Sequence, residues 1–402
     1  MKNILELAKS LNGETIKLRR ELHKFPETGL LLPKTSEFVK AHLQELNIPF
    51  KTYEKHSGIV ALIGKKTGGK TIALRADMDG LKIKEKTGLD YSSENENMHA
   101  CGHDCHTAML LSTAKILKEH EDELNGQIKL IFQPGEEGPG GALPMVEDGV
   151  LENPKVDAIL ALHVGNLAES ITEGIELQQG DVIVSHSNMF AADDQFYIKI
   201  TGKGGHGSMP DITVDPVAVS IQVMNSLQYI ISREIKPSNP IVITISSIIA
   251  GRETYNIIPE YAEIRGTIRC LDYETRDFIF KRMTEIVQGI SKTMRAIGEI
   301  EFLDGYPPLI NDSKVVDSFI KAAKELIGDE KVHVVEESIM GGEDASFFFE
   351  KVPGCYFFLN TPYYEDGICY PAHNSKFKID ESQLFEGVAL FVKAATDILN
   401  EK

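Results

Sequence analysis

The densest group of chemically reactive side chains lies between residues 98 and 106, which read Met-His-Ala-Cys-Gly-His-Asp-Cys-His. Thiol, imidazole and carboxylate donors at this spacing favour zinc, manganese or cobalt over a hydrophobic core. A redox or structural pair of Cys101 and Cys105 is the simpler alternative. A structural zinc ribbon would need a second close pair of Cys or His residues downstream, and the sequence contains none.

More ionisable residues follow three apolar runs that we predict to be strands, at residues 71–75, 128–132 and 158–162. Asp77 follows the first run, Glu136-Glu137 the second, and His163 the third. Open α/β sheets bind ligands outside the carboxyl ends of their strands. One such residue would pass for a solvated strand end, but three in succession indicate a site.

Five candidates form a mixed set of sulfur, nitrogen and oxygen donors: Cys101, His103, Glu137, His163 and His373. Five donors exceed the needs of one tetrahedral zinc ion with an open position, and they suit two divalent ions if one ligand bridges. The thiolate of Cys101 could be that bridge. A two-metal hydrolytic site activates a shared water, and another group must carry its proton to the leaving nitrogen. Glu136, beside Glu137, is the expected general base.

Neighbouring titratable residues are expected to support these ligands. Asp77 and Asp104 could hold ligand imidazoles through the second ring nitrogen, and His99 and His106 could orient ligands in a similar way. Surface roles are expected for six further histidines: His23, His42, His56, His120, His186 and His333.

The elements that must position these residues divide the chain into a catalytic α/β domain and an inserted domain. Residues 1–184 and 299–402 are predicted to form the first, with a mixed central sheet flanked by helices. Residues 185–298, followed by a short strand at 299–302, show the β-α-β-β-α-β order of a ferredoxin-like domain. Residues 241–250 are rich in Ile and Val and form a predicted edge strand, so we expect a homodimer through this domain.

Composition narrows the class of protein. The formal net charge of −18 argues against a nucleic-acid partner. The sequence has no apolar run of about 18 residues, and its first residues lack a signal peptide's apolar core, so no membrane segment is expected. Five scattered cysteines indicate a reducing compartment, and the cytoplasm is the expected location.

Four motifs then occur in one order: Arg-Ala-Asp-Met-Asp at 75–79, His-Ala-Cys-Gly-His-Asp at 99–104, Gln-Pro-Gly-Glu-Glu at 133–137 and Gly-Gly-His-Gly-Ser-Met-Pro at 204–210. Together they resemble the M20 metallopeptidase superfamily, in its aminoacylase, hippurate hydrolase and auxin-conjugate hydrolase branch. The resemblance runs from Leu18 to His373. It implies a catalytic α/β domain, an inserted lid that also dimerises, ligand roles for the five donors, and Glu136 as general base.

The resemblance also implies roles for residues of the inserted domain. His206 would polarise the scissile carbonyl or stabilise its oxyanion, and a solvated loop histidine is the alternative. Asn256 resembles the family's contact to the substrate carboxylate. Arg269 could pair with the same carboxylate or be a structural strand residue. Asp211 stands where relatives often carry a histidine, which leaves substrate preference open.

The expected function is therefore a dinuclear metal-dependent amidohydrolase that cleaves N-acyl amino acids, with Glu136 as general base. A carboxypeptidase or dipeptidase with the same machinery is the nearer alternative, because both cleave an amide beside a free carboxylate. A non-catalytic protein that binds an amino-acid conjugate is the other alternative, and the intact ligand set with Glu136 argues against it. The sequence leaves the acyl group, the amino acid, the metal and the choice between dimer and tetramer open.

Overall fold

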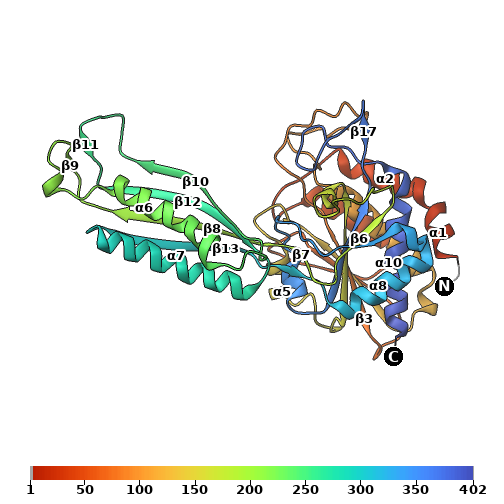
Figure 1. The fold of residues 1–402 in the computed structure, drawn as a ribbon. Helices are drawn as coiled ribbons and strands as arrows, with labels where there is room; N and C mark the ends of the chain where they lie inside the picture. The colour runs from red at the N-terminus through yellow and green to blue at the C-terminus, as the bar shows by residue number, and fades with distance from the viewer. Residues whose placement is uncertain (1–2, 402) are drawn as a thin grey trace. The chain divides into compact units, whose positions relative to one another are not determined.

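The computed structural model describes residues 3–401, which divide into two compact units (Figure 1). Unit 1 contains the chain up to Met189 together with Ile310–Ile339 and the residues from Asp344 onward. Unit 2 contains Phe190–Leu309 and Met340–Glu343. Unit 1 is thus assembled from segments that precede and follow unit 2 in the sequence.

Unit 1 is built on an eight-stranded mixed sheet in the order β1-β2-β4-β3-β5-β16-β6-β15. Its strands are β1 (Phe50–Thr52), β2 (Ile59–Ile63), β3 (Thr71–Asp77), β4 (Gln127–Gln133), β5 (Ala158–Gly165), β6 (Val182–Val184), β15 (Val332–Val334) and β16 (Gly354–Asn360). The adjacent strands β4, β3, β5 and β16 run parallel. Every residue of β3 and β5 is buried, as expected for parallel strands covered on both faces.

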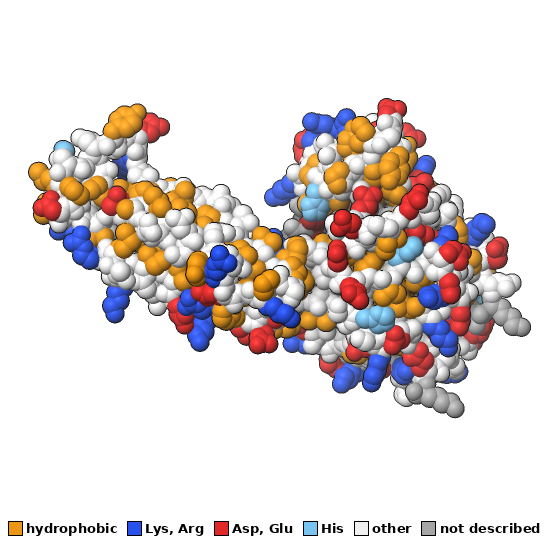
Figure 2. All heavy atoms as spheres, in the orientation of Figure 1, with side chains coloured by type: hydrophobic (Ala, Val, Ile, Leu, Met, Phe, Trp, Pro, Cys, Tyr) orange, Lys and Arg blue, Asp and Glu red, His pale blue; other side chains and the backbone are white. Residues whose placement is uncertain are grey.

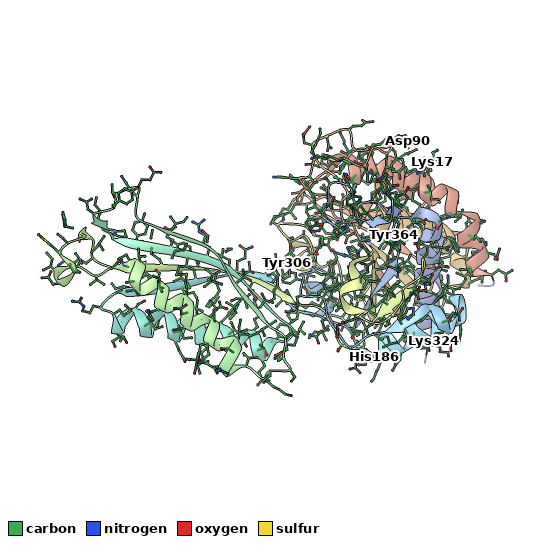
Figure 3. The ribbon with its side chains drawn as sticks, turned by 45° about the horizontal axis from the view of Figure 1, so that its top comes forward. Lys17, Asp90, His186, Tyr306, Lys324 and Tyr364 are labelled. Carbon is green, nitrogen blue, oxygen red and sulfur yellow. The ribbon has the colours of Figure 1, made fainter. Side chains whose placement is uncertain are left out.

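Helices flank this sheet: α1 (Ile4–Ser10), α2 (Asn12–His23), α3 (Pro33–Glu45), α4 (His103–Glu119), α5 (Ala142–Glu147), α8 (Ser313–Ile327), α9 (Ser346–Phe349) and α10 (Leu384–Asn400). Pro33 occupies the first turn of α3, as the sequence predicted. On α2, Leu18 and Leu22 are buried, whereas Lys17 points outward (Figure 3). The α10 helix packs against α1, α4 and α8, which closes the core on that face of the sheet.

Unit 2 has a four-stranded antiparallel sheet in the order β10-β12-β8-β13, with its own hydrophobic core. Its main elements are β8 (Ala192–Thr201), α6 (Pro216–Tyr229), β10 (Val242–Ala250), β12 (Tyr261–Cys270), α7 (Tyr273–Thr293) and β13 (Ile297–Tyr306). Burial alternates along β8, because one face of the sheet packs against helices. The β-α-β-β-α-β order is ferredoxin-like, and with the mixed sheet of unit 1 it confirms the predicted fold class.

Several strands were not predicted from the sequence. β1, β6, β7 (Asn188–Phe190) and β15 have only three residues each. The two-residue strands are β9 (Gly205–His206), β11 (Ile257–Ile258), β14 (Leu309–Ile310), β17 (Tyr364–Glu365) and β18 (Ile368–Cys369). Segments this short carry no recognisable alternation of apolar and polar residues. β13 is longer than the predicted strand at 299–302 because it pairs with β8 along almost its whole length.

Candidate metal centre

The carboxyl ends of three adjacent parallel strands converge on one group of polar side chains. Asp77 is the last residue of β3, the Glu136-Glu137 turn follows β4, and His163 lies near the end of β5. β3 pairs with both β4 and β5, so these strand ends are neighbours. The structure therefore brings together the residues that the strand pattern predicted.

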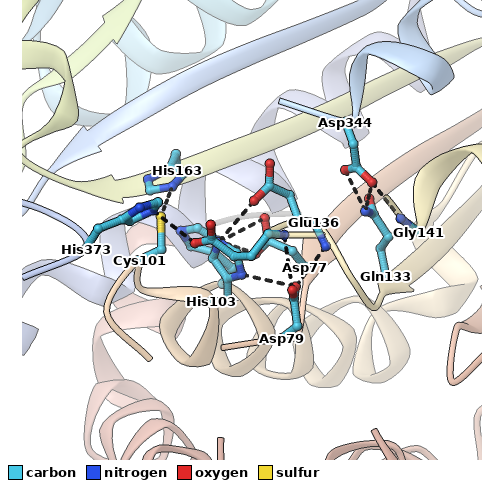
Figure 4. Close-up of polar contacts among 12 residues, drawn as sticks. Asp77, Asp79, Cys101, His103, Gln133, Glu136, Gly141, His163, Asp344 and His373 are labelled. Atoms are coloured by element: carbon cyan, nitrogen blue, oxygen red, sulfur yellow. Dashed lines mark hydrogen bonds and ion pairs between the residues drawn. The ribbon is translucent and has the colours of Figure 1, made fainter. Parts of the chain in front are cut away.

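The five predicted ligands lie within this group. Cys101, His103, His163 and His373 are labelled in Figure 4. Cys101 Sγ is 3.3 Å from His163 Nε2, and His373 Nε2 is 3.1 Å from Glu137 Oε1. His103 Nε2 is 4.0 Å from Glu137 Oε1, which links the two halves of the group. Candidate donor atoms of Cys101, His103 and His163, and of Cys101, Glu137 and His373, lie within 4.8 Å of one another. Cys101 belongs to both sets, as a bridging ligand must.

Hydrogen bonding fixes the tautomer of His163. Its Nδ1 donates to the carbonyl oxygen of Val164 at 2.7 Å. The neutral ring therefore carries its lone pair on Nε2, the atom that faces Cys101. A metal-binding imidazole needs this arrangement, in which one nitrogen donates to an anchor and the other is free to coordinate.

His103 is buried among carboxylates. Its Nδ1 lies 3.4 Å from Asp79 Oδ1 and its Nε2 lies 3.7 Å from Asp77 Oδ2. Burial alone would lower the pKa of His103, but Asp77, Asp79 and Glu137 outweigh this and raise it to about 10. Both ring nitrogens of His103 are buried, and neither has a hydrogen-bond partner of normal geometry among the described residues. This surplus of buried negative charge fits a site that accepts cations.

The pKa values of Cys101 and Glu137 are shifted in opposite directions. Burial, followed by the charges of Glu137 and Glu136, raises the pKa of the Cys101 thiol well above its usual range. Burial favours the neutral form of Glu137 too, but His373 and His103 lower the pKa of its carboxyl. The neighbouring carboxylates therefore favour the neutral thiol, and a cation bound beside Cys101 would favour the thiolate instead.

Two unusual backbone conformations position the ligands. Gly102 lies between Cys101 and His103 with φ +90°, and a Cβ atom there would meet Val164 Cγ2 at 2.7 Å and Ile379 Cδ1 at 2.9 Å. His373 itself has φ +65°, and its backbone N–H donates to the carbonyl oxygen of Ala100 at 2.7 Å. Non-glycine residues in this region are uncommon and cluster at functional sites. The hydrogen bond joins the His373 loop to the segment that contains Cys101.

The residues expected to support ligands make the following contacts. Asp77 Oδ1 accepts from His106 Nδ1 at 2.5 Å, and Asp77 Oδ2 accepts from Arg75 Nη1 at 2.8 Å. Asp104 does not contact a ligand imidazole by any hydrogen bond found among residues 3–401. It instead forms an ion pair with Arg19 Nε at 2.8 Å and a hydrogen bond with His23 Nδ1 at 2.7 Å.

Surface roles were expected for His23 and His56, and for both this expectation is wrong. Both are buried, at 1% and 2% exposure. His23 is enclosed between Asp104 and Glu85, and His56 accepts from the backbone N–H of Gly58 at 3.1 Å. The partners of these histidines are far away in sequence or come from irregular loops, so local polarity was misleading.

Four further residues around the centre were missed as functional candidates: Arg75, Asp79, Gln133 and Asp344. Asp79 accepts from the backbone N–H groups of Glu136 at 3.0 Å and Glu137 at 3.1 Å, so it holds the turn that carries both. Its position two residues after Asp77, on a chain leaving a buried strand, was the available signal. The other three form the hydrogen-bond network considered below.

The residues assigned in the inserted domain lie in unit 2. His206 is in β9, which pairs with β11, and Asn256 directly precedes β11. The backbone N–H of Gly207 donates to the carbonyl oxygen of Asn256 at 2.8 Å, so the two predicted substrate contacts are neighbours. Arg269 lies elsewhere in the unit and forms an ion pair with Asp193.

Comparison with known proteins gives the class of this chain. Residues 73–397 match the model of peptidase family M20/M25/M40, and the chain belongs to that family. Thermostable carboxypeptidase 1 of Saccharolobus solfataricus is 39% identical over 394 residues, 96% of this chain and 95% of that protein. N-acyl-L-amino acid amidohydrolase of Geobacillus stearothermophilus is 40% identical over 315 residues, 77% of this chain and 80% of that protein. The family predicted from the motifs is confirmed.

A solved structure shares the same architecture. The YXEP protein of Bacillus subtilis, a dinuclear metal binding peptidase from the M20 family, superposes with a TM-score of 0.82 and 31% sequence identity. The match covers 97% of this chain and 99% of that chain. None of the helices formed by residues 3–401 combines the length and apolar character that a membrane crossing requires.

Proposed function

We propose that this protein is a dinuclear metal-dependent amidohydrolase that cleaves the amide bond of N-acyl-L-amino acids. The observation that carries the proposal is the convergence of five donor side chains on one centre, with the Glu136 carboxylate beside them; Cys101, His103 and His163 are buried, whereas His373 closes the centre from its exposed side. Two divalent ions would be held by Cys101, His103, Glu137, His163 and His373. When bound, such ions polarise a carbonyl group and lower the pKa of water. Zinc, manganese and cobalt all suit this donor set.

Glu136 is the proposed general base. Its carboxyl is largely buried, and its Oε2 lies 3.9 Å from His103 Nε2. Glu137, the next residue, lies at a similar distance from His103 but also contacts His373 Nε2 at 3.1 Å. Glu136 takes a proton from the attacking water on a carboxylate oxygen and passes it to the departing amine nitrogen.

Residues of unit 2 are proposed to contact the substrate. His206 would donate to the scissile carbonyl or its oxyanion, and the Nδ1 of its exposed imidazole accepts from the backbone N–H of Ser208 at 3.2 Å. That contact favours the tautomer with a proton on Nε2, the one needed for donation to a carbonyl. Asn256 is proposed to bind the carboxylate of the substrate. Arg269 is either a further contact to that carboxylate or a structural strand residue that pairs with Asp193.

Two further assignments concern the protein's partners and location. β10 is an edge strand of the unit 2 sheet, and Ile248 and Ile249 on it are 45% and 52% exposed. Apolar side chains lie along the face of unit 2 visible in Figure 2. An exposed apolar edge favours pairing with a second copy, so we propose a homodimer through unit 2. The cytoplasm stays the expected location.

A carboxypeptidase is the second candidate function. The specific observation in its favour is the 39% identity to thermostable carboxypeptidase 1 over 95% of that protein. Both reactions cleave an amide beside a free carboxylate, so the same residues serve either substrate.

The test is the release of amine from a panel of N-acyl amino acids, N-blocked peptides and dipeptides. Metal-stripped protein would be reconstituted separately with zinc, manganese and cobalt. We expect metal-dependent cleavage of N-acyl amino acids with poor cleavage of peptides. Preference for peptides would favour the carboxypeptidase, and inactivity with every metal would contradict both functions.

The assignment of Glu136 is tested by Glu136→Gln. This variant should bind metal as the parent does and lose about 10²- to 10⁴-fold in kcat, because it cannot accept a proton. Turnover near the parent rate would show that another group is the base.

A further inference from the structure

Asp344 is a fully buried carboxylate outside the proposed ligand set. Its Oδ2 accepts from the backbone N–H groups of Gly141 at 2.8 Å and Ala142 at 2.9 Å. Gln133 Nε2 donates to Oδ1 at 2.6 Å and to Oδ2 at 2.8 Å. Arg75 Nη2 adds an ion pair to Oδ1 at 3.2 Å. Asp344 thus gathers donors from three separate parts of the chain (Figure 4).

These donors lie at both ends of the loop that carries the general base. Gln133 ends β4 just before Glu136, whereas Gly141 and Ala142 begin α5 just after it. The ends approach so closely that a Cβ on Gly141 would be 1.7 Å from the carbonyl oxygen of Pro134. Asp344 clamps these ends together, while Asp79 holds the middle through two backbone N–H groups. The loop therefore depends on two buried carboxylates.

The guanidinium of Arg75 extends this network to the metal ligands. Its Nη1 donates to Asp77 Oδ2 at 2.8 Å, and its Nε donates to Gln133 Oε1 at 2.8 Å. Asp77 Oδ2 in turn lies 3.7 Å from His103 Nε2, and Asp77 Oδ1 lies 2.5 Å from His106 Nδ1. Because a guanidinium is a rigid planar fork, its orientation between two carboxylates fixes the position of both.

We propose that Asp344 is a positioning residue that aligns the Glu136 loop with the imidazole ligand His103. The expected effect of Asp344 on turnover rests on the proposed function, whereas its expected effect on metal binding does not depend on the substrate. Asp344→Asn would replace one of the two acceptor oxygens by a donor and remove the negative charge that Arg75 and three other donors share. The Glu136 loop and Asp77 then lose the contacts that fix their positions relative to each other.

The test exchanges the carboxylate and the amide between two residues in contact. Asp344→Asn places an amide among donors, and Gln133→Glu places two carboxylates against each other. The double variant restores one carboxylate and one amide, and the new carboxylate can still accept from Arg75 Nε. Asp181→Asn is the matched control, since Asp181 is a 3% exposed carboxylate of unit 1 that accepts from His333 Nε2 at 2.9 Å.

The measurements are zinc and cobalt dissociation constants and stoichiometry by competition with a chromophoric chelator, kcat and KM, and thermal unfolding. Asp344→Asn should weaken metal affinity and lower kcat by ~10- to 100-fold each, with KM changed by about twofold at most. The double variant should recover at least about 10-fold over either single variant. Asp181→Asn should keep the metal affinity and kcat of the parent.

Four results would overturn the inference. Parent metal affinity in folded Asp344→Asn, with only a lower unfolding temperature, would reveal a purely structural role. Loss of one metal equivalent would make Asp344 a ligand. Metal affinity and kcat no higher in the double variant than in Gln133→Glu would show that the two side chains do not act through their mutual contact. This comparison holds even if Asp344→Asn does not fold. An equal drop in metal affinity in Asp181→Asn and Asp344→Asn would show that the effect is not specific to Asp344. Failure of the proposed function would appear separately, as inactivity of the parent.

Discussion

His106 Nε2 accepts a hydrogen bond from the backbone N–H of Val164 at 3.0 Å. The ring must therefore carry its proton on Nδ1, which donates to Asp77. Since His106 belongs to α4 and Val164 to β5, one imidazole joins the helix that contains His103 to the strand that contains His163. The distance between two proposed ligands is thus set by a side chain outside the proposed ligand set.

His106→Ala should weaken metal affinity by ~10- to 100-fold, because both anchors of the ring are lost. Equilibrium dialysis against zinc and cobalt measures the effect. His120→Ala serves as the control, since His120 pairs with Glu123 at the surface and touches no proposed ligand. Equal metal affinities in the parent and His106→Ala would show that the two hydrogen bonds of His106 are not needed to position the ligands.

Gly102→Ala should displace Cys101 and His103, because the added methyl group has no room beside Val164 and Ile379. We expect at least a 10-fold loss of metal affinity, on the order of the loss from a misplaced supporting residue. Gly88→Ala separates crowding from backbone strain: Gly88 also has positive φ, at +71°, but a Cβ there meets nothing within 4 Å. That control should lose about 1–2 kcal/mol of stability and retain metal binding. Similar metal affinities in the two variants would contradict the prediction.

Glu85→Gln should destabilise the protein in a pH-dependent way. Burial favours the neutral acid, but hydrogen bonds from His23, Thr87 and Ser93 lower the pKa of Glu85 to about 2. A carboxyl whose pKa is lower in the folded state stabilises fully above its unfolded pKa and loses this effect as pH falls towards the folded value. Urea unfolding should show a loss of about 1–3 kcal/mol at pH 6 that shrinks below about pH 4.5. A loss that does not vary with pH would mean that the charge is unimportant.

Ile249→Lys should weaken the proposed homodimer. A lysine on the exposed edge strand β10 would be buried without a partner in the interface, raising the dimer dissociation constant by at least about 10-fold. Sedimentation velocity over a concentration series measures this constant. Ile297→Lys is the control, because Ile297 is 64% exposed on β13, the opposite edge of the same sheet. Dissociation by the control alone would place the interface on β13 instead.

The sequence predicted the parts of this structure that depend on local order. Asp77, Glu137 and His163 each follow a recognisable apolar run, so the sheet alone suffices to bring them together. The inserted unit was predicted because its helices and strands are long enough to show clear periodicity. Such patterns are the strongest signal that a single sequence carries.

What the sequence did not reveal depends on contacts between distant segments. Asp344 lies in an irregular Gly-Gly-Glu-Asp segment, and nothing local indicates that its carboxylate meets Gln133 and Arg75. His23 appeared polar and exposed because its partners, Asp104 and Glu85, come from remote positions. β6 and β15 have only three residues each and are defined as strands by their pairing within the sheet of unit 1.

The division of unit 1 into segments before and after unit 2 has a consequence for biosynthesis. Four proposed ligands, Cys101 through His163, leave the ribosome before unit 2, but His373 emerges only after it. β16, between β5 and β6 in the sheet, is also made late. The nascent chain must keep an open sheet edge while unit 2 is synthesised, and late non-local pairing of this kind is slow. All five proposed metal ligands are therefore present only in a chain whose translation has passed residue 373.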